Sequence, residues 1–348
     1  MAGSPVRRIS LVARDRIGVY VHVPFCRKRC PYCAFTLIES DGSLHERFAD
    51  KVCREIRRAA KPARTLYFGG GTPSLLSPDQ LARIVRSVDG RPDEVTVECN
   101  PERLNLDGLR EIGVTRITLG IQALDDGLLR FLGREHDAEE ARRAYRETSR
   151  HFGNVCVDLI FGVPGQTLEG WRRTLEEVRS WRPAHVSLYG LTYEKGTPFE
   201  RLRDRLPEDT ERAMYESAMD ALADYHHYEI SNFALPGFES MHNLGTWEGR
   251  PYLGFGPGAH SYVAPERWWN LANVREYLER DDVVAGRETL TPEQQRIEGL
   301  LLGLRTDRGV ALEAIPAGLE EHLERSDGRV RLTRAGRAVA DTVIAKLV

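Results

Sequence analysis

Three cysteines stand close together near the start of the chain, at Cys26, Cys30 and Cys33. Their C-x-x-x-C-x-x-C spacing follows a short apolar run at residues 18–23, and the basic residues 27–29 stand among them. Three thiolates from one short loop can converge on one metal centre, and nearby cations favour the thiolate form. A cubane iron–sulfur cluster has four irons, so three thiolates would leave one iron open to a small ligand.

A zinc site is the alternative interpretation of the same cysteines. Structural zinc takes four closed ligands, so the fourth would have to come from Cys53, Cys99 or a distant histidine, with no recognisable spacing. The isolated Cys53, Cys99 and Cys156 stand in helix-like or strand-like segments, which predicts small buried hydrophobic side chains. A disulfide framework would be unusual in a chain of this length without a signal peptide.

Polar residues and glycines recur at the ends of strand-like runs. In βα barrels, functional side chains collect at the C-terminal ends of the strands. Glycines there let backbone N–H groups approach a ligand closely, and a carboxylate can hold an ammonium group or a ribose hydroxyl. Each residue taken alone is equally compatible with a structural role. These residues are Gly70, Gly71, Thr72, Glu98, Gln122, Arg134 and Asp158.

The elements that must position these residues alternate between short β-branched runs and longer amphipathic ones. Strand and helix repeated some six times indicate a parallel sheet of βα units, fewer than the eight of a closed barrel. A partial barrel and an open doubly wound sheet both fit this period. The six predicted strands are residues 18–23, 65–68, 95–98, 116–121, 155–160 and 185–188.

Helix start signals stand between those strands. A serine or aspartate followed three residues later by Glu or Gln is the capping-box pattern, and we expect a helix to begin at each. The three predicted caps are Ser43 with Glu46, Ser77 with Gln80, and Asp137 with Glu140.

The pattern changes after about residue 198. Residues 208–225 predict one helix, whereas residues 228–269 have no clear period. From Thr291 a small α-rich unit begins, with a strand at 329–332 and a helix at 333–347, an order that resembles a winged helix. The predicted units are a tail at 1–14, a barrel at 15–200, an α+β extension at 201–290 and a C-terminal α-rich domain at 291–348.

Composition limits the function classes. The 348 residues include 49 Lys and Arg against 52 Asp and Glu, a net charge of −3, whereas dedicated nucleic-acid binders are usually clearly basic. No apolar run approaches the ~18 residues of a membrane span, and residues 1–16 lack the apolar core of a signal peptide. We therefore expect a cytoplasmic protein that is not an integral membrane protein and binds no nucleic acid.

The cysteine loop resembles the signature of radical S-adenosylmethionine enzymes. Its flanking sequences, YVHVPFC at 20–26 and CPYCAF at 30–35, are similar to those of the oxygen-independent coproporphyrinogen oxidases and their relatives. The resemblance implies a partial (βα)6 barrel and a 4Fe–4S cluster on the three cysteines. It also implies that the open iron binds the amino and carboxylate groups of S-adenosylmethionine, whose sulfur–carbon bond is cleaved by one electron from the cluster.

The same resemblance implies roles for the other candidate residues. The strand-end residues named above match positions that contact S-adenosylmethionine in the relatives, and Tyr20 and Tyr32 match positions beside the cluster and cofactor. In some members Gln122, Arg134 and Asp158 belong to a second S-adenosylmethionine site. No residue is assigned a catalytic role.

Three features indicate the branch of the family. Phe35 stands where coproporphyrinogen dehydrogenases have a fourth cysteine, and only 25 residues precede the first cysteine, too few for their N-terminal arm. The segments MHNLGTW at 241–247 and YLGFGPGAHS at 252–261 resemble the HemW haem chaperones, whose motif is His-Asn-x-x-Tyr-Trp. The resemblance makes His242 the expected haem ligand, and this chain has Thr246 where the motif has tyrosine.

The function implied is that of a cytoplasmic chaperone that binds haem as cargo and delivers it to respiratory haem proteins at the membrane. A donor such as flavodoxin or ferredoxin would supply electrons to the cluster. The first alternative is a radical methyltransferase or cyclopropane-forming enzyme of secondary metabolism. Coproporphyrinogen III oxidase, which Phe35 argues against, and a purely structural iron–sulfur or zinc protein are the others.

Overall fold

The computed structural model describes residues 16–102, 104–311 and 315–347, so the predicted tail at 1–14 lies outside the described residues. Its largest element is a sheet of twelve strands. Among the described residues, no helix is long and apolar enough to cross a membrane.

Six parallel strands form the centre of the sheet, and they confirm all six predicted strands. They are hydrogen-bonded in chain order, so each helix returns the chain to the next position along the sheet. The six are β1 (Ile17–Val23), β4 (Ala63–Gly70), β5 (Glu94–Cys99), β6 (Arg116–Gln122), β7 (Val155–Phe161) and β8 (His185–Gly190).

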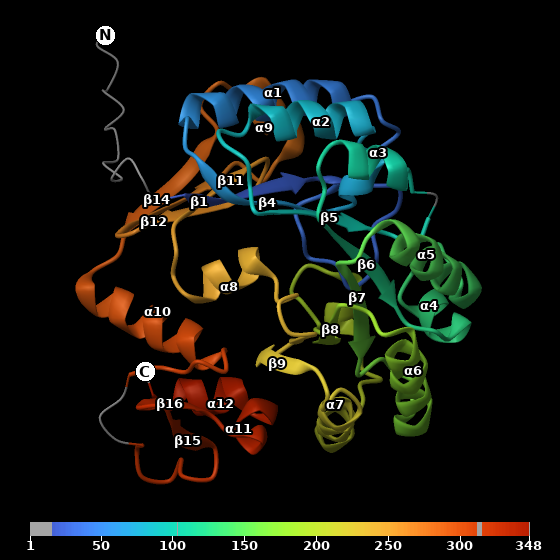
Figure 1. The fold of residues 1–348 in the computed structure, drawn as a ribbon, viewed down its shortest axis with the longest axis vertical. Helices are drawn as coiled ribbons and strands as arrows, with labels where there is room; N and C mark the ends of the chain where they lie inside the picture. The colour runs from blue at the N-terminus through green and yellow to red at the C-terminus, as the bar shows by residue number, and fades with distance from the viewer. Residues whose placement is uncertain (1–15, 103, 312–314, 348) are drawn as a thin grey trace.

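Helices cover the outer side of this curved sheet, as Figure 1 shows. A doubly wound sheet would carry helices on both faces. Of the two folds that the alternation of strands and helices allowed, the structure is therefore the partial barrel. The outer helices are α1 (His45–Ala59), α2 (Pro78–Ser87), α3 (Leu106–Glu111), α4 (Asp126–Phe131), α5 (Ala138–His151) and α6 (Leu168–Trp181).

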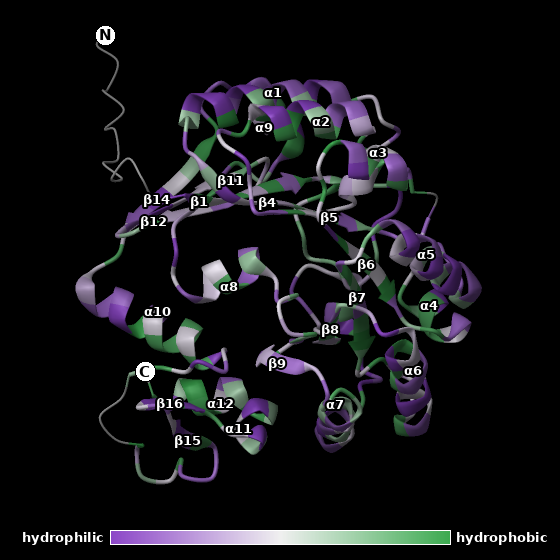
Figure 2. Ribbon diagram, viewed as in Figure 1, coloured by the Kyte–Doolittle hydropathy of each residue, from purple (hydrophilic) through white to green (hydrophobic). Residues whose placement is uncertain are grey.

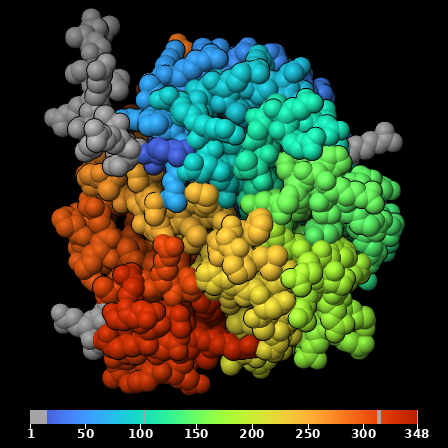
Figure 3. All heavy atoms as spheres, viewed as in Figure 1, coloured from blue at the N-terminus to red at the C-terminus, as the bar shows by residue number. Residues whose placement is uncertain are grey.

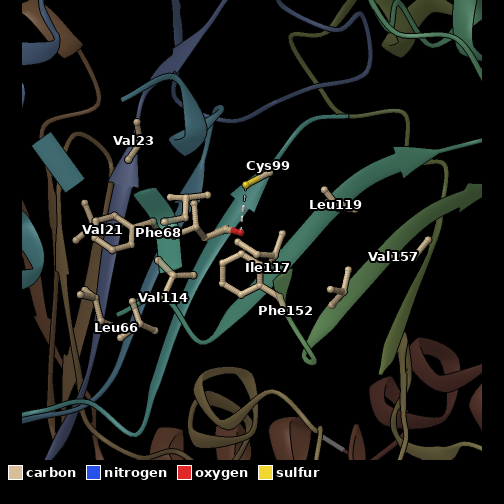
Figure 4. Close-up of a cluster of buried hydrophobic side chains, with 14 of the residues drawn as sticks. Val21, Val23, Leu66, Phe68, Cys99, Val114, Ile117, Leu119, Phe152 and Val157 are labelled. Atoms are coloured by element: carbon tan, nitrogen blue, oxygen red, sulfur yellow. Dashed lines mark hydrogen bonds between the residues drawn. The ribbon is translucent and has the colours of Figure 1, made fainter. Parts of the chain in front are cut away.

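The main core lies between the sheet and these helices. Figure 4 shows Val21, Leu66, Ile117 and Val157, from four different strands, among its buried side chains. Figure 2 shows hydrophilic residues predominating on the surrounding helices. The amphipathic period of the helices therefore buries one stripe of each against the strands.

Short strands extend the sheet at both edges, through the region that had no clear period. Each has only three to six residues, too few to produce a recognisable alternation. At the β1 edge lie β11 (Tyr252–Phe255), β12 (His260–Val263), β13 (Glu266–Asn270) and β14 (Val284–Thr289); at the β8 edge lie β10 (Asn232–Ala234) and β9 (His226–Glu229).

Two of the three predicted helix caps are confirmed as capping boxes, at Ser77 for α2 and at Asp137 for α5. The prediction at Ser43 is wrong, because α1 begins at His45 after Leu44, which makes no side-chain cap. The reason is a turn before the helix: the Ser43 N–H donates to Asp41 Oδ1 at 2.9 Å, and the His45 N–H donates to the Gly42 carbonyl at 3.1 Å.

The C-terminal unit has its own small core, which includes Leu304, Val330 and Val343. The predicted single helix at 333–347 is wrong in one respect, since a break at Val339 divides it and lets both halves turn toward this core. The predicted helix at 208–225 is confirmed as α7 (Glu208–Ala221), which ends four residues before the predicted end because the chain turns there into β9. Figure 3 shows the unit in red at the lower left of the molecule, and Arg334 pairs with Asp220 on α7 at 2.6 Å. The elements are α10 (Pro292–Leu304), β15 (Leu323–Ser326), β16 (Arg329–Leu332), α11 (Arg334–Ala338) and α12 (Ala340–Ala345).

Candidate functional site

The cysteine loop leaves the sheet directly after β1. It is bounded by the parallel pair β2 (Phe25–Cys26) and β3 (Ile38–Glu39). The guanidinium of Arg29 donates to the carbonyls of Cys33 and Leu37, at 3.1 and 2.8 Å. Arg29 therefore fixes the shape of the loop, in addition to placing a positive charge beside the cysteines.

All three cysteine side chains line one cavity of about 450 Å³ at the C-terminal ends of the parallel strands. Cys26 Sγ lies 3.5 Å from Thr72 Oγ1, and an Arg134 N–H donates to Cys30 Sγ at 3.6 Å. Burial raises the pKa of Cys26 to about 11, and it also raises the pKa of the Cys33 thiol. Among the described residues no three His, Cys, Asp or Glu side chains group around a single metal ion. Three thiols on one cavity match the number expected for a 4Fe–4S cluster that has one open iron.

The same cavity contains all but one of the other residues expected there. The sequence proposal named twelve residues for the cluster and cofactor, and only Tyr20 does not line the cavity. Tyr20 lies beneath it, where its hydroxyl is 3.0 Å from His22 Nδ1 and its ring stacks on Tyr67. The residues that line the cavity with the cysteines are Tyr32, Gly70, Gly71, Thr72, Glu98, Gln122, Arg134 and Asp158.

Two half-buried carboxyl groups give the cavity its electrostatic character. Glu98 accepts hydrogen bonds from the Tyr67 hydroxyl at 2.7 Å and from the Gly70 N–H at 3.1 Å. Burial raises the pKa of Glu98 to about 7 and the pKa of Asp158 to about 6, because the charged forms lose their hydration. Neither forms an ion pair with another described residue, although the charge of Arg116 acts on both acids and opposes the rise of their pKa values. Both acids therefore remain able to contact a cationic ligand.

Gln122 and Arg134 carry polar atoms that no described residue satisfies. Gln122 ends β6 with a φ of 68°, a strained angle for this residue type, and its Oε1 is buried without a partner. Arg134 Nη2 donates to Asn100 Oδ1 at 2.5 Å and to the Gly120 carbonyl at 3.0 Å, while its buried Nε has no partner. Unpaired buried groups of this kind fit a site that a polar ligand completes.

Asn100 is a cavity residue that the sequence proposal missed. Its side-chain amide donates to Thr72 Oγ1 at 3.2 Å while its oxygen accepts from Arg134, so it joins the glycine turn to the arginine. Its position directly after β5, before Pro101, was the available signal.

The glycine turn works differently from the expectation. Its N–H groups bond within the chain: Gly70 donates to Glu98, Gly71 to the Val23 carbonyl at 2.8 Å, and Thr72 to the Phe25 carbonyl at 2.7 Å. A Cβ at Gly71 would lie 2.6 Å from the Phe25 carbonyl oxygen, so no side chain fits there. The glycines thus allow the turn to pack against the cysteine loop rather than offer free donors.

Cys156 corrects another expectation, since it is not a purely apolar side chain. It is fully buried, but its sulfur lies 2.9 Å from His185 Nδ1, 3.2 Å from Ser187 Oγ and 3.3 Å from Asp158 Oδ1. Cys53 and Cys99 are buried as predicted, and Figure 4 shows Cys99 within the apolar cluster.

His242 lies elsewhere, on the short helix α8 (Met241–Trp247), where the sequence indicated no regular structure. Figure 1 shows α8 on the inner side of the sheet. The Ser240 hydroxyl caps the helix, and the Glu94 carboxylate accepts the N–H groups of Met241 and His242, both at 3.0 Å.

The ring of His242 is held at one nitrogen only. Its Nδ1 is 2.8 Å from Thr65 Oγ1, and its ring centroid lies 5.1 Å from that of Tyr67. The Thr65 hydroxyl therefore orients the imidazole. Burial lowers the pKa of His242 to about 4, so the ring is neutral at pH 7. Its Nε2 forms no hydrogen bond with the described residues and is available to a metal.

Comparison with known proteins adds independent findings. Residues 20–178 match the model of the radical SAM superfamily. The chain is 37% identical to the haem chaperone HemW of Lactococcus lactis, covering 85% of this chain and 83% of that one, and 33% identical to the HemW of Bacillus subtilis, covering 94% and 97%. Its fold matches coproporphyrinogen III oxidase (HemN) from Escherichia coli with a TM-score of 0.80 and 20% identity, over 95% of this chain and 89% of that one.

Proposed function

This chain belongs to the HemW family, and from that premise we propose that it carries a 4Fe–4S cluster, binds S-adenosylmethionine and binds haem as cargo. The observation that carries the proposal is the convergence of eleven of the twelve predicted cluster and cofactor residues on one cavity. Cys26, Cys30 and Cys33 would hold the cluster. When bound, such a cluster supplies one electron for cleavage of a sulfur–carbon bond.

The chain's own residues suit S-adenosylmethionine, which carries a sulfonium, an ammonium and a carboxylate. Glu98 and Asp158 would neutralise its positive charges, and the raised pKa of each acid would fall on that contact. Arg134, held by Asn100 and the Gly120 carbonyl, would face the carboxylate, and Gln122 Oε1 would gain a donor. Two of these residues also carry a buried polar atom that has no partner among the described residues, namely Gln122 Oε1 and Arg134 Nε.

Haem would be bound through His242 Nε2. Because the pKa of His242 is lowered to about 4, the ring needs no deprotonation before it ligates iron. Thr65 and Tyr67 would keep the imidazole in place. We propose that the chaperone acts in the cytoplasm, receives electrons from a flavodoxin or ferredoxin, and transfers haem to respiratory proteins at the membrane.

Anaerobically reconstituted protein tests the proposal in two titrations. S-adenosylmethionine and haem should each saturate, and haem should give the Soret band of a histidine-ligated iron. The His242→Ala protein should lose that band and keep S-adenosylmethionine binding. His151→Ala is the matched control, because His151 ends the outer helix α5. A wild-type protein without saturable haem binding would refute the haem-chaperone function, whereas release of S-adenosylhomocysteine in a methyl-transfer assay would support the methyltransferase alternative.

A further inference from the structure

A second and larger cavity lies on the inner side of the sheet, between α8, the edge strands and the C-terminal unit, an arrangement that can be followed in Figure 1. Its volume is about 1010 Å³, at the upper end of the range for small-molecule sites. It shares no lining residue with the cofactor cavity. Its walls belong to segments distant in sequence, namely residues 246–252, 262–267, 295–310 and 326–331.

Part of the cavity wall is apolar and aromatic, as a flat aromatic ligand requires. Trp247 from α8, Tyr252 and Tyr262 from the edge strands, and Leu301 and Leu302 from α10 all line the cavity. The buried Nε1 of Trp247 has no partner among the described residues. A cavity that combines rings, branched aliphatic groups and an unused donor suits a large amphipathic molecule better than water.

Gly299 provides a second observation. It lies inside α10, where glycine is a poor helix former, and it lines the cavity. A Cβ at Gly299 would meet nothing within 4 Å, so no neighbouring residue requires glycine there. A ligand that lies against the helix would need this open space, which would account for a glycine at this position.

A fixed positive charge among the lining residues provides a third observation. Four of the five arginines that line the cavity pair with carboxylates, whereas Arg329 forms no ion pair with the described residues. Arg329 instead donates to the carbonyls of Arg308 and Gly309, at 2.9 and 2.8 Å. Its guanidinium is therefore fixed in place with its charge uncompensated, the arrangement that a carboxylate would complete.

The cavity also adjoins His242. A cleft of about 20 Å³ is lined by His242 and shares Thr246, Arg250 and Tyr252 with the large cavity. Trp247 and His242 belong to the same short helix, so a ligand that rests on the tryptophan lies beside the segment that carries the imidazole.

We propose that this cavity holds the haem macrocycle, with a propionate at Arg329, the ring edge over Gly299, and the iron on the side of His242. The inference rests on the proposed function, and it assigns the C-terminal unit a part in holding the cargo. A carboxylated tetrapyrrole matches the aromatic side chains, the open helix face, the fixed cation and the nearby imidazole together.

The test uses the full reconstituted chain and two probes, haem and iron-free protoporphyrin IX, followed by Soret absorbance and porphyrin fluorescence. Gly299→Phe should weaken both probes at least about tenfold by occupying the space, whereas Gly299→Ala should bind both as the wild type does. Arg329→Gln should weaken both about tenfold or more, because a charged hydrogen bond is lost, and Arg329→Lys should recover part of the affinity. Arg296→Gln is the matched control, since Arg296 lies on α10, pairs with Glu293 and does not line the cavity.

The outcomes separate this inference from the proposed function. Wild-type haem binding that depends on His242 but is unchanged in Gly299→Phe and Arg329→Gln would overturn the cavity assignment and leave the haem-binding function standing. Absence of haem binding in the wild type would refute that function itself. Thermal unfolding and S-adenosylmethionine titration check each variant. If Gly299→Phe fails to fold, the haem and protoporphyrin IX affinities of Arg329→Gln and Arg329→Lys decide whether the ligand occupies this cavity.

Discussion

Glu94 should determine whether α8 holds its histidine in place. Its carboxylate is 4% exposed and accepts the first two N–H groups of the helix, at 3.0 Å each. In Glu94→Ala both donors would be left buried without an acceptor. A hydrogen bond to a charged group contributes about 1.5–3 kcal/mol, and since two bonds to one carboxylate are not additive, the combined loss should be about 2–4 kcal/mol.

Nearby Arg116 adds to this cost. It is almost fully buried, and Glu94 is among the groups whose negative charge raises its pKa. Removing Glu94 leaves this cation with less compensation, which adds to the loss in the same direction. Ser240→Ala, which removes one neutral cap, should cost only ~0.5–2 kcal/mol. The expected order of stability is therefore wild type, then Ser240→Ala, then Glu94→Ala.

Two assays check the prediction. Denaturant unfolding followed by circular dichroism measures the free energy of unfolding, and haem titration measures the effect on His242, which we expect to be at least a tenfold loss of affinity in Glu94→Ala. Glu139→Ala is the control, because Glu139 is exposed on α5 and pairs only with Arg146. If Glu94→Ala unfolds at the same denaturant concentration as Glu139→Ala and binds haem with wild-type affinity, Glu94 does not position the helix.

Three further predictions concern the cofactor cavity. Cys30→Ala should lose its iron and sulfide after anaerobic reconstitution, because two thiolates cannot hold the cluster, whereas Cys53→Ala should keep both; full iron content in Cys30→Ala would contradict the cluster assignment. Binding of S-adenosylmethionine should tighten as pH rises through about 7, where the Glu98 carboxyl loses its proton; Asp158 has a lower pKa, at about 6, and is already charged there. Glu98→Gln should weaken binding by about one to two decades and flatten this pH dependence. An unchanged pH profile in this variant would argue against the role of Glu98. The protein should not convert coproporphyrinogen III to protoporphyrinogen IX in an anaerobic assay, because Phe35 replaces the fourth cysteine; accumulation of product would refute this.

The central strands and most residues of the cofactor cavity could be predicted because they carry local sequence signals. The six central strands are buried on both faces and therefore read as apolar β-branched runs, which made them and their C-terminal ends visible in the sequence. The residues that follow those ends converge because parallel strands all point the same way, so eleven of the twelve predicted residues meet in one cavity. Tyr20 does not line the cavity because it lies three residues before the end of β1, where its ring stacks on Tyr67.

What was not predictable depends on contacts between distant segments. Helix α8 has seven residues, too few for a periodic pattern, and the carboxylate that holds its first turn is 147 residues away in sequence, on β5. The large cavity also depends on contacts between distant segments, because its walls meet only after the edge strands and the C-terminal unit pack together. The Ser43 cap failed for a local reason, the competing turn at Asp41 and Gly42.

Strand β4 gives the two sites a common support. At its start Thr65 holds the His242 imidazole, and at its end Gly70 donates to Glu98. Between them Tyr67 contacts both, since its hydroxyl donates to Glu98 and its ring packs on His242. A ligand that draws Glu98 toward itself alters the hydrogen bond that fixes this ring, and a ligand on His242 acts on the same ring from the other side. Any energetic coupling through Tyr67 must be reciprocal. If bound S-adenosylmethionine changes the affinity for haem by some factor, bound haem must change the affinity for S-adenosylmethionine by the same factor.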